Sequence, residues 1–370
     1  MDIKKEAYEK AIKVLEKCIT PIGFTAANPS YQAIWSRDSM ITSLGASLVD
    51  KPEFKDAFKK SLNTLADKQS ELGQIPNAVH IKDKRADFAS IDSSLWFIIG
   101  EYIYAERFND KSLLKKHKKN IEKAFLWLRY QDFGEDSLPE QQPTSDWQDC
   151  FPHRYGHTIH TQALYYKVLK LLNKKDIIRK VVERINHPTD GLWNKEFYYS
   201  YRWKNHNKHH EVGEWFDSLA NLLAIIYGLA DKNQSEKILS YIKKEKIDHP
   251  YPVKTIYPCI KKDSKYWYDY FYDCEAEIPY HYINGGIWPY IGGFYVLALI
   301  KMKKFNEAEI QLEKLAELNM KKDGAFWEWF NGKTGEPGIT GWKKDNRNQA
   351  WNAGMYILAY ESVKMKKVLI

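Results

Sequence analysis

Two acidic residues, Asp149 and Glu328, lie in segments of the sequence that are rich in tryptophan. Asp149 comes two residues after Trp147, and Glu328 lies directly between Trp327 and Trp329. A carboxyl group that packs against aromatic rings, away from bulk water, has a raised pKa, as a general acid at neutral pH requires. Two such groups could act as a pair in which one donates a proton and the other accepts one.

The aromatic residues around these acids indicate what such a pair could act on. Tryptophan, tyrosine and phenylalanine make up 15% of the 370 residues, and many of them lie in polar segments rather than in apolar runs. A sugar ring has C–H surfaces that stack on aromatic faces and hydroxyl groups that bind polar side chains. Two carboxyl groups hydrolyse a glycosidic bond when one protonates the leaving oxygen and the other activates water or attacks the anomeric carbon. We therefore expect a carbohydrate site. The alternatives are that the rings only close one end of the fold, and that each acid caps a helix or binds a sugar hydroxyl.

The composition excludes several other classes of protein. The chain is 44% hydrophobic and 28% charged, which is typical of a globular protein and excludes disorder as its main state. The net charge of +8 comes from lysines spread over predicted helix surfaces, so we expect no nucleic-acid partner. No apolar run approaches about 18 residues, and the first residues predict an amphipathic helix rather than a signal peptide. We therefore expect no membrane partner and a cytoplasmic location.

Neither a metal nor any other cofactor is predicted. The four cysteines are scattered without a C-x-x-C pair, so we expect reduced thiols. The histidine-rich run HNKHH at 206–210 could bind a metal, but a solvated loop is the simpler interpretation.

Hydrophobic periodicity predicts about twelve helices and almost no strands. Helices that are apolar all round, such as 215–230, alternate with helices that have one apolar stripe and a lysine-rich face, such as 111–130. The first kind is buried and the second lies outside it. Six outer–inner pairs predict an all-α fold, an (α/α)6 barrel or six-hairpin toroid, as a single domain over residues 1–370. The predicted helices are 2–19, 38–49, 54–70, 92–108, 112–129, 159–173, 175–186, 214–230, 234–244, 286–302, 304–319 and 348–365.

The connections between the predicted helices differ in length and composition. Those that enter inner helices are long and rich in Trp, Tyr, His, Asp and Gly, as in 145–160 and 326–352, whereas 108–111 is short. Because functional residues gather on loops held by a rigid scaffold, one end of the barrel is predicted to carry the site. The irregular stretches 187–213 and 245–285 have strand-like or coil character, as in FYYSYRW and KYWYDYFYD, and are expected to be insertions that line its cleft.

Six motifs follow one another along the chain. They are WSRDSMITSLGA (35–46), ASIDSSLWFI (89–98), WQDCFPHRYGHTIHTQALYY (147–166), YHYINGGIWP (280–289), EWFNGKTG (328–335) and QAWNAGMY (349–356). They resemble the motif series of two related glycosidase groups, the alkaline/neutral invertases and the amylo-α-1,6-glucosidase domain of glycogen-debranching enzymes. Each motif alone has low specificity, but six in order over about residues 31–360 are a strong signal. Both groups are similar to an (α/α)6 barrel, which agrees with the helix pattern.

The resemblance implies roles for individual residues. In the invertase group the acid is an aspartate eight residues before the histidine of a G-H…Q-A-L-[FY]-Y segment, and the W-M-D aspartate of the debranching group falls on the same position, Asp149. The base is a glutamate that opens an E-Y-Y-D-G-K-T-G-like segment, matched by Glu328. Arg37 and Asp38 correspond to a W-x-R-D motif that holds the terminal sugar, although a structural ion pair is the alternative. The residues implied to bind substrate are Trp35, Arg37, Asp38, Asp92, Trp96, Trp147, His157, Gln162, His281, Asn284, Trp288, Gln349 and Trp351.

The chain also departs from both groups. The invertases have a proline immediately before the base glutamate, where this chain has Trp327. The segment 284–295 is intermediate between the two groups and does not assign the substrate. Debranching enzymes carry a glucanotransferase domain for which 370 residues leave no room, so we expect a small saccharide rather than glycogen.

The expected reaction is single-displacement hydrolysis of an α-glucosidic bond with inversion. A small saccharide and water are the only expected reactants, and no cofactor takes part. Asp149 donates the proton and Glu328 activates water, which requires carboxyl groups roughly 6.5–9.5 Å apart. It stays open whether Asp146 shares the acid role. The alternatives are a sugar epimerase or isomerase on the same barrel, with histidines as acid and base, and a non-catalytic sugar-binding protein. Product analysis separates the first, and binding without turnover identifies the second.

Overall fold

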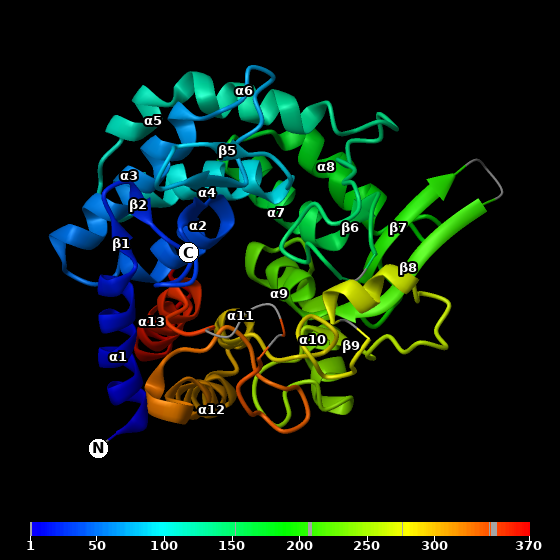
Figure 1. Cartoon of the computed structure of the whole chain (residues 1–370). Helices are drawn as coiled ribbons and strands as arrows, with labels where there is room; N and C mark the ends of the chain where they lie inside the picture. Colours follow the sequence, from blue (N-terminus) through cyan, green and yellow to red (C-terminus); the bar gives the residue numbers. More distant parts are fainter. Residues whose placement is uncertain (1, 152, 206–208, 276, 340, 342–345) are drawn as a thin grey trace.

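The computed structural model describes residues 2–151, 153–205, 209–275, 277–339, 341 and 346–370, and these residues form a helix-rich fold (Figure 1). Six helices coincide with the predicted inner set to within a few residues. They are α2 (Ser36–Ala46), α4 (Asp92–Arg107), α7 (Ile159–Leu171), α9 (Ser218–Tyr227), α11 (Pro289–Lys301) and α13 (Ala350–Met365). The other helices are α1 (Ile3–Lys17), α3 (Pro52–Asp67), α5 (Ser112–Lys116), α6 (Lys118–Arg129), α8 (Lys175–Ile185), α10 (Lys232–Lys244) and α12 (Phe305–Gly324).

The six inner helices form a closed ring. Each contacts two others, in the order α2, α4, α7, α9, α11, α13 and back to α2. Every residue of α2 and α9 is buried, because side chains of these helices meet neighbours on all sides. In Figure 1 the six helices surround the centre of the molecule, and the remaining helices lie outside them.

The outer helices are amphipathic, as their lysine-rich faces predict. In α8, for example, Val181 and Ile185 are buried, whereas most other residues are partly or fully exposed. The predicted helix 112–129 is wrong in one respect, because it is divided into α5 and α6 at His117. The His117 Nδ1 atom lies 2.6 Å from Glu101 Oε1 on α4, and both side chains are buried. This long-range pair fixes the position of the break, and no local pattern indicates it.

Three small antiparallel sheets correct the all-α prediction. Their strands are β1 (Ile19–Thr20) with β2 (Gly23–Phe24); β3 (Ala33–Trp35), β4 (Ala78–His80) and β5 (Ala86–Asp87); and β6 (His157–Thr158), β7 (Tyr199–Asn205), β8 (His209–Asp217) and β9 (Ile256–Tyr257). A 3₁₀ helix, η1 (Asp269–Cys274), follows in the second irregular stretch. The two irregular stretches therefore contain a β-hairpin and a short helix rather than coil alone.

The hairpin of β7 and β8 corrects the start of the predicted helix 214–230. Residues 214–217 belong to β8, in which Phe216 and Asp217 pair with neighbouring strands, so α9 begins at Ser218 instead of 214. The Asp217 side chain accepts a hydrogen bond from the Ala220 backbone at 3.1 Å and caps the helix there. Within the hairpin, a Cβ atom at Gly213 would lie 2.4 Å from the ring of Tyr201, so only glycine lets that ring pack flat on the opposite strand.

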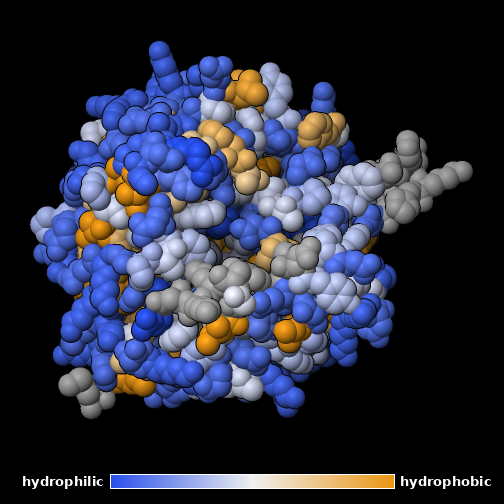
Figure 2. All heavy atoms as spheres, in the orientation of Figure 1, coloured by the Kyte–Doolittle hydropathy of each residue, from blue (hydrophilic) through white to orange (hydrophobic). Residues whose placement is uncertain are grey.

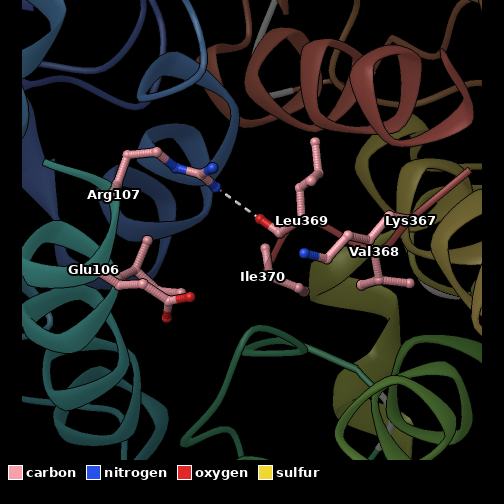
Figure 3. Close-up of a pocket in the computed structure, with 7 residues that line it drawn as sticks. Glu106, Arg107, Lys367, Val368, Leu369 and Ile370 are labelled. Carbon is pink, nitrogen blue, oxygen red and sulfur yellow. Dashed lines mark hydrogen bonds between the residues drawn. The ribbon is translucent and has the colours of Figure 1, made fainter. Parts of the chain in front are cut away.

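Strands also lead directly into ring helices and fix the direction in which each helix starts. The strands β3, β6 and β8 end at the residue before α2, α7 and α9. One large hydrophobic core extends from α1 to α13, and the last residues of the chain pack against it. Arg107 Nη2 donates a hydrogen bond to the Leu369 carbonyl at 2.7 Å (Figure 3). No helix of the described ranges is both long and apolar enough for a membrane span.

Candidate active site

One cavity lies where the first turns of ring helices meet long loops. Trp35 and Trp288 are the residues just before α2 and α11, and Arg37, Asp38 and Trp351 lie in the first turn of α2 or α13. The described residues that line the cavity are Tyr31, Trp35, Arg37, Asp38, Trp147, Asp149, Tyr282, Trp288, Glu328 and Trp351. The two acids singled out in the sequence therefore lie in one cavity, together with six of the predicted substrate-binding residues.

Asp149 lies in the loop that precedes β6. Its side chain is exposed to the cavity, yet protein atoms surround the cavity closely enough that desolvation raises the pKa of Asp149 to about 6. The positive charge of Arg37 opposes this increase, whereas Asp146 and Asp38 add to it by charge repulsion. A carboxyl group with such a pKa stays partly protonated at neutral pH and can donate a proton.

Glu328 lies in the loop between α12 and α13 and is only 3% exposed. The Tyr31 hydroxyl donates a hydrogen bond to Glu328 Oε1 at 2.7 Å. The main chain of Glu328 is also fixed, since its N–H donates to the Asn346 carbonyl at 2.8 Å and its carbonyl accepts from Asn352 Nδ2 at 3.3 Å. A carboxylate held at both main chain and side chain can orient a water molecule for attack at a defined position.

Arg37 connects α2 with α4 through a buried ion pair. Its Nη1 atom lies 3.3 and 3.2 Å from the two carboxylate oxygens of Asp92, and its Nε atom lies 3.7 Å from Asp38 Oδ2. Burial raises the pKa of Asp38 to about 6, although Arg37 opposes the shift. Among the described residues, neither Arg37 Nε nor Asp38 Oδ2 has a hydrogen-bond partner. Buried polar atoms of this kind at a cavity wall can bind the hydroxyl groups of a ligand.

Indole rings form much of the cavity wall. Trp288 packs edge-on against Trp147 and Trp351, with ring centroids 5.8 Å apart in both pairs, and Trp351 stacks on Tyr290 at 4.1 Å. The Nε1 atoms of Trp147 and Trp351 have no hydrogen-bond partner in the described part of the chain, whereas Trp288 Nε1 donates to the Tyr282 carbonyl at 3.2 Å. The wall therefore combines apolar faces with N–H groups that can bind sugar hydroxyls.

Asp146 has a different environment from Asp149. It is buried in an ion pair with Arg154, whose Nη2 lies 2.5 Å from Asp146 Oδ2 and whose Nη1 contacts Asp217. Asp146 also accepts hydrogen bonds from Gln141 Nε2 at 2.9 Å and from the Gln148 backbone at 2.8 Å. Burial alone would raise the pKa of Asp146, but Arg154 holds it well below its usual range. This residue is therefore ionised, and its ion pair and hydrogen bonds fix the loop that carries Asp149.

Of the remaining predicted substrate-binding residues, Asp92 reaches the site only through Arg37, and two others serve the core or the backbone. Trp96 is one turn after Asp92 on α4 and is fully buried against Phe294, with ring centroids 6.4 Å apart. The Asn284 amide binds the main chain of Ile260 twice, as acceptor and donor, at 2.8 Å each. Neither side chain is among the lining residues of the cavity.

The two predicted glutamines are also bound to the main chain. Gln162 Nε2 donates to the Pro139 carbonyl at 2.7 Å, and Gln349 Nε2 donates to the Asn346 carbonyl at 3.5 Å. Both side chains are fully buried outside the cavity lining. They hold the loops that carry Asp149 and Glu328, so their contribution to the site is to position it.

The two predicted histidines lie outside the cavity lining as well. His281 packs edge-on against Trp329 at 4.4 Å, and its Nε2 lies 3.2 Å from Glu275 Oε2. His157 lies in a separate pocket, with Nε2 at 3.7 Å from a carboxylate oxygen of both Asp136 and Glu140.

Two residues of the cavity, Tyr31 and Tyr282, were not predicted from the sequence. Both lie in the aromatic loops that enter ring helices, but no spacing distinguishes them from the many other tyrosines there. Tyr31 is recognisable only from its hydrogen bond to Glu328.

Other parts of the described structure are weaker candidates for an active site. A cavity between α4 and the last residues contains Glu106, Arg107 and Lys367, and no aromatic ring is among its described lining residues (Figure 3). No group of three potential metal ligands occurs in the described ranges. His206 of the histidine-rich run lies outside the described residues. The face in Figure 2 is mostly polar, with scattered apolar side chains.

Two family models match different parts of the chain. The model described as amylo-alpha-1,6-glucosidase matches residues 10–131, and the model described as alkaline and neutral invertase matches residues 201–365. The first range contains Arg37 and Asp38, and the second contains Glu328. Asp149 lies between the two ranges, so its assignment rests on its motif and on the cavity.

Individual relatives agree with these matches. Neutral/alkaline invertase 1, mitochondrial, from Oryza sativa subsp. japonica is 25% identical over 324 residues, which cover 73% of this chain and 50% of the relative. Alkaline/neutral invertase C, mitochondrial, from Arabidopsis thaliana is 25% identical over 331 residues, which cover 74% of this chain and 48% of the relative. The chain thus spans about half the length of these curated relatives.

A solved structure of a mannosylglycerate hydrolase from Thermus thermophilus, in complex with glucose, has the same fold. The TM-score is 0.71 with 14% sequence identity, and the match covers 95% of this chain and 99% of that chain. The comparisons confirm the relationship that the six motifs predict: the chain is a relative of glycoside hydrolases, similar in sequence to the alkaline and neutral invertases and to the amylo-alpha-1,6-glucosidases.

Proposed function

We propose that this protein is an inverting glycoside hydrolase that cleaves an α-glucosidic bond in a small saccharide. The observation that carries the proposal is that Asp149 and Glu328 line one cavity with Arg37, Asp38 and a wall of tryptophans. The names of both matched families, invertase and amylo-alpha-1,6-glucosidase, support the choice of an α-glucosidic substrate. The closed ring of six helices, surrounded by outer helices, supports an (α/α)6 barrel.

In the proposed reaction Asp149 is the general acid. It transfers its proton to the glycosidic oxygen as the bond to the anomeric carbon breaks, so that the leaving group departs as a neutral alcohol. A water molecule attacks the anomeric carbon from the opposite face, and Glu328 accepts its proton. The α-linked substrate then gives a β-anomeric product, and exchange with solvent returns both carboxyl groups to their starting states.

The remaining cavity residues hold the sugar whose bond is cleaved. Arg37 Nε and Asp38 Oδ2, which form an ion pair but lack hydrogen-bond partners within the described structure, offer a donor and an acceptor to neighbouring hydroxyl groups. Trp147, Trp288 and Trp351 offer faces for the C–H surface of the ring. This arrangement orients the anomeric carbon between the two acids.

A panel of small α-glucosides, followed by anomer-resolved NMR, tests the proposal. We expect one substrate to release a β-configured sugar first, and Asp149→Asn and Glu328→Gln each to lower kcat by about 10²–10⁴-fold while binding survives. Glu336→Gln, an exposed carboxylate eight residues after Glu328, is the matched control and should retain activity. An α-configured first product would contradict inversion, and full activity in either acid variant would contradict the assignment of roles.

The same panel separates the alternative functions. An epimerase or isomerase would convert one sugar into another without releasing a second sugar from a disaccharide. That chemistry needs histidines at the site, and none is among the described residues that line the cavity. A sugar-binding protein would bind members of the panel without turnover.

A further inference from the structure

A row of aromatic rings extends from the loop that carries Asp149. We call it the aromatic band, and its members touch one another in the order Trp203, Tyr155, His153, Tyr268 and Tyr270. The successive ring centroids are 5.3, 5.3, 4.5 and 6.0 Å apart. The band joins three segments that are distant in sequence: strand β7, the loop after Asp149, and the start of η1. In Figure 1 the yellow turn of η1 lies beside the green hairpin of β7 and β8.

The position of the band follows from its two members in the loop that carries Asp149, which we call the acid loop. His153 and Tyr155 are four and six residues after Asp149. Phe151 of the same loop packs on Phe271 of η1, with ring centroids 4.5 Å apart and both side chains fully buried. A general acid must contact the oxygen of the leaving group, so the leaving group lies against the loop that carries the acid. The band therefore adjoins the leaving-group side of the site.

The rings of the band are held rigidly and are open to solvent in part. Tyr270 is 37% exposed, and its hydroxyl lies 2.8 Å from His153 Nδ1. The Tyr155 hydroxyl donates to Glu211 Oε2 at 2.5 Å. Trp203, Tyr155, His153 and Tyr268 are half-buried. Rings whose polar edges are already bound lose little conformational freedom when a ligand stacks on them.

The neighbouring charges favour a neutral ligand. Burial lowers the pKa of His153, so its ring is uncharged at neutral pH, and Glu211 is occupied by the hydroxyl groups of Tyr155 and Tyr201. A neutral aromatic surface beside hydroxyl groups suits the C–H faces of pyranose rings.

We propose that the aromatic band binds sugar units of the leaving group beyond the one that is directly linked to the cleaved bond. This inference rests on the proposed function for the direction of the substrate. It assigns the substrate class as an oligosaccharide of three or more sugar units, with the terminal unit in the cavity, the next beside Asp149, and later units on the band.

Binding as a function of chain length tests the assignment. The ligands are maltose to maltohexaose and isomaltose to isomaltohexaose, titrated calorimetrically into Asp149→Asn protein so that cleavage does not interfere. In one of the two series we expect the affinity to rise at least tenfold between two and four sugar units. Wild-type protein should show the same trend in kcat/KM, with a matching preference for the longer substrate.

Two variants locate the effect on the band. Tyr268→Ala and Tyr270→Ala should each lower the affinity for the tetrasaccharide at least fivefold and change that for the disaccharide by less than twofold. Tyr272→Ala is the matched control, because Tyr272 lies on the same 3₁₀ helix, is 43% exposed and contacts Trp267 instead of the band. It should bind all chain lengths as the parent protein does. Tyr270 is exposed enough that its replacement tests the band even where Tyr268→Ala does not fold.

Several results would overturn the inference. One is an affinity that does not depend on chain length. Another is an equal loss of affinity for disaccharide and tetrasaccharide in the band variants, which would show that the rings only pack η1 against the loop that carries Asp149. Failure of the proposed function is distinguishable, since a protein that hydrolyses no saccharide can still show length-dependent binding that the band variants abolish. Hydrolysis of short and long chains at equal kcat/KM would overturn the band alone.

Discussion

The pKa of Asp149 predicts how activity depends on pH. Desolvation raises this pKa from an ordinary value of 3.8 to about 6. The proposed acid acts only when protonated, and a carboxyl group is protonated below its pKa. The titration of Asp149 should therefore leave activity constant below about pH 5 and make it fall as the pH rises through 6.

The size of the effect follows from the protonated fraction. At pH 7 a carboxyl group with a pKa of about 6 is about 9% protonated, whereas one with the ordinary value is about 0.06% protonated. The environment of Asp149 thus increases the active fraction about 140-fold at pH 7. Each further unit of pH should lower kcat/KM about tenfold, because the protonated fraction then falls in proportion to the proton concentration.

The assay is the initial rate of hydrolysis from pH 4 to 9 at substrate concentrations well below KM. Asp38 also has a pKa of about 6, so its titration must be separated from that of Asp149. A decline that persists in Asp38→Asn, at a lower pH because the charge of Asp38 helps to raise the pKa of Asp149, and that disappears in Asp149→Asn belongs to Asp149. Glucosyl fluoride supplies a second check, because its fluoride leaving group departs without protonation. Asp149→Asn protein should therefore hydrolyse glucosyl fluoride far better than it hydrolyses an ordinary glycoside. A rate that stays constant from pH 5 to 8, or a decline near pH 6 in Asp149→Asn, would refute the reasoning.

Three further substitutions test the electrostatics of the site. The pKa of Asp38 is near 3.8 in the unfolded chain and near 6 in the folded chain, so its ionisation at neutral pH opposes folding. Asp38→Asn should therefore raise the free energy of unfolding by up to roughly 3 kcal/mol at pH 7 and have little effect at pH 4. Urea unfolding at both pH values tests this. Arg37→Met removes the cation between two buried carboxylates and should lower the free energy of unfolding by about 3–5 kcal/mol, whereas Arg179→Met on the exposed surface should change it by less than about 0.5 kcal/mol. Asp146→Asn takes a carboxylate from Arg154 and should cost about 3–5 kcal/mol of stability in the same assay. The folded fraction of Asp146→Asn should keep the decline of activity, moved to a lower pH because the charge of Asp146 helps to raise the pKa of Asp149, and loss of that decline would show that Asp146 shares the acid role.

The helices could be predicted because their signal is local. In α8 the spacing of Val181 and Ile185 places both on one face, and two of the three residues between them, Glu183 and Arg184, are charged. The run of α9, in which Ser218 and Asn221 interrupt an otherwise largely apolar sequence, similarly indicates burial on all sides. These two patterns, repeated along the chain, are sufficient to order the helices into an inner and an outer set.

The features that could not be predicted depend on contacts between distant segments. The break at His117 is set by Glu101 on another helix, and the strand at 214–217 exists because it pairs with β7 and β9. In isolation the second segment has the residues of a helical start, and only the partner strands decide otherwise.

The same distinction explains which site residues were recognised. Asp149 and Glu328 could be predicted to share a site because the expected chemistry requires acids among rings, and both lie in one cavity. Trp96 could not be separated from the cavity tryptophans, because nothing in its spacing of one helical turn, about 5.4 Å, from Asp92 shows that its ring packs in the core.

The polar residues of the motifs divide in the structure into two kinds that look alike in the sequence. Arg37 Nε and Asp38 Oδ2 have no hydrogen-bond partner in the described part of the chain and belong to residues that line a cavity, whereas Gln162 Nε2 and the amide of Asn284 are bound to main-chain groups. Both kinds are needed at one site, since the first can bind a ligand only while the second holds the loops in place. What separates them is whether a backbone group lies within hydrogen-bond distance, which is a property of the folded chain. A motif can therefore locate an active site before it can say which of its residues touch the substrate.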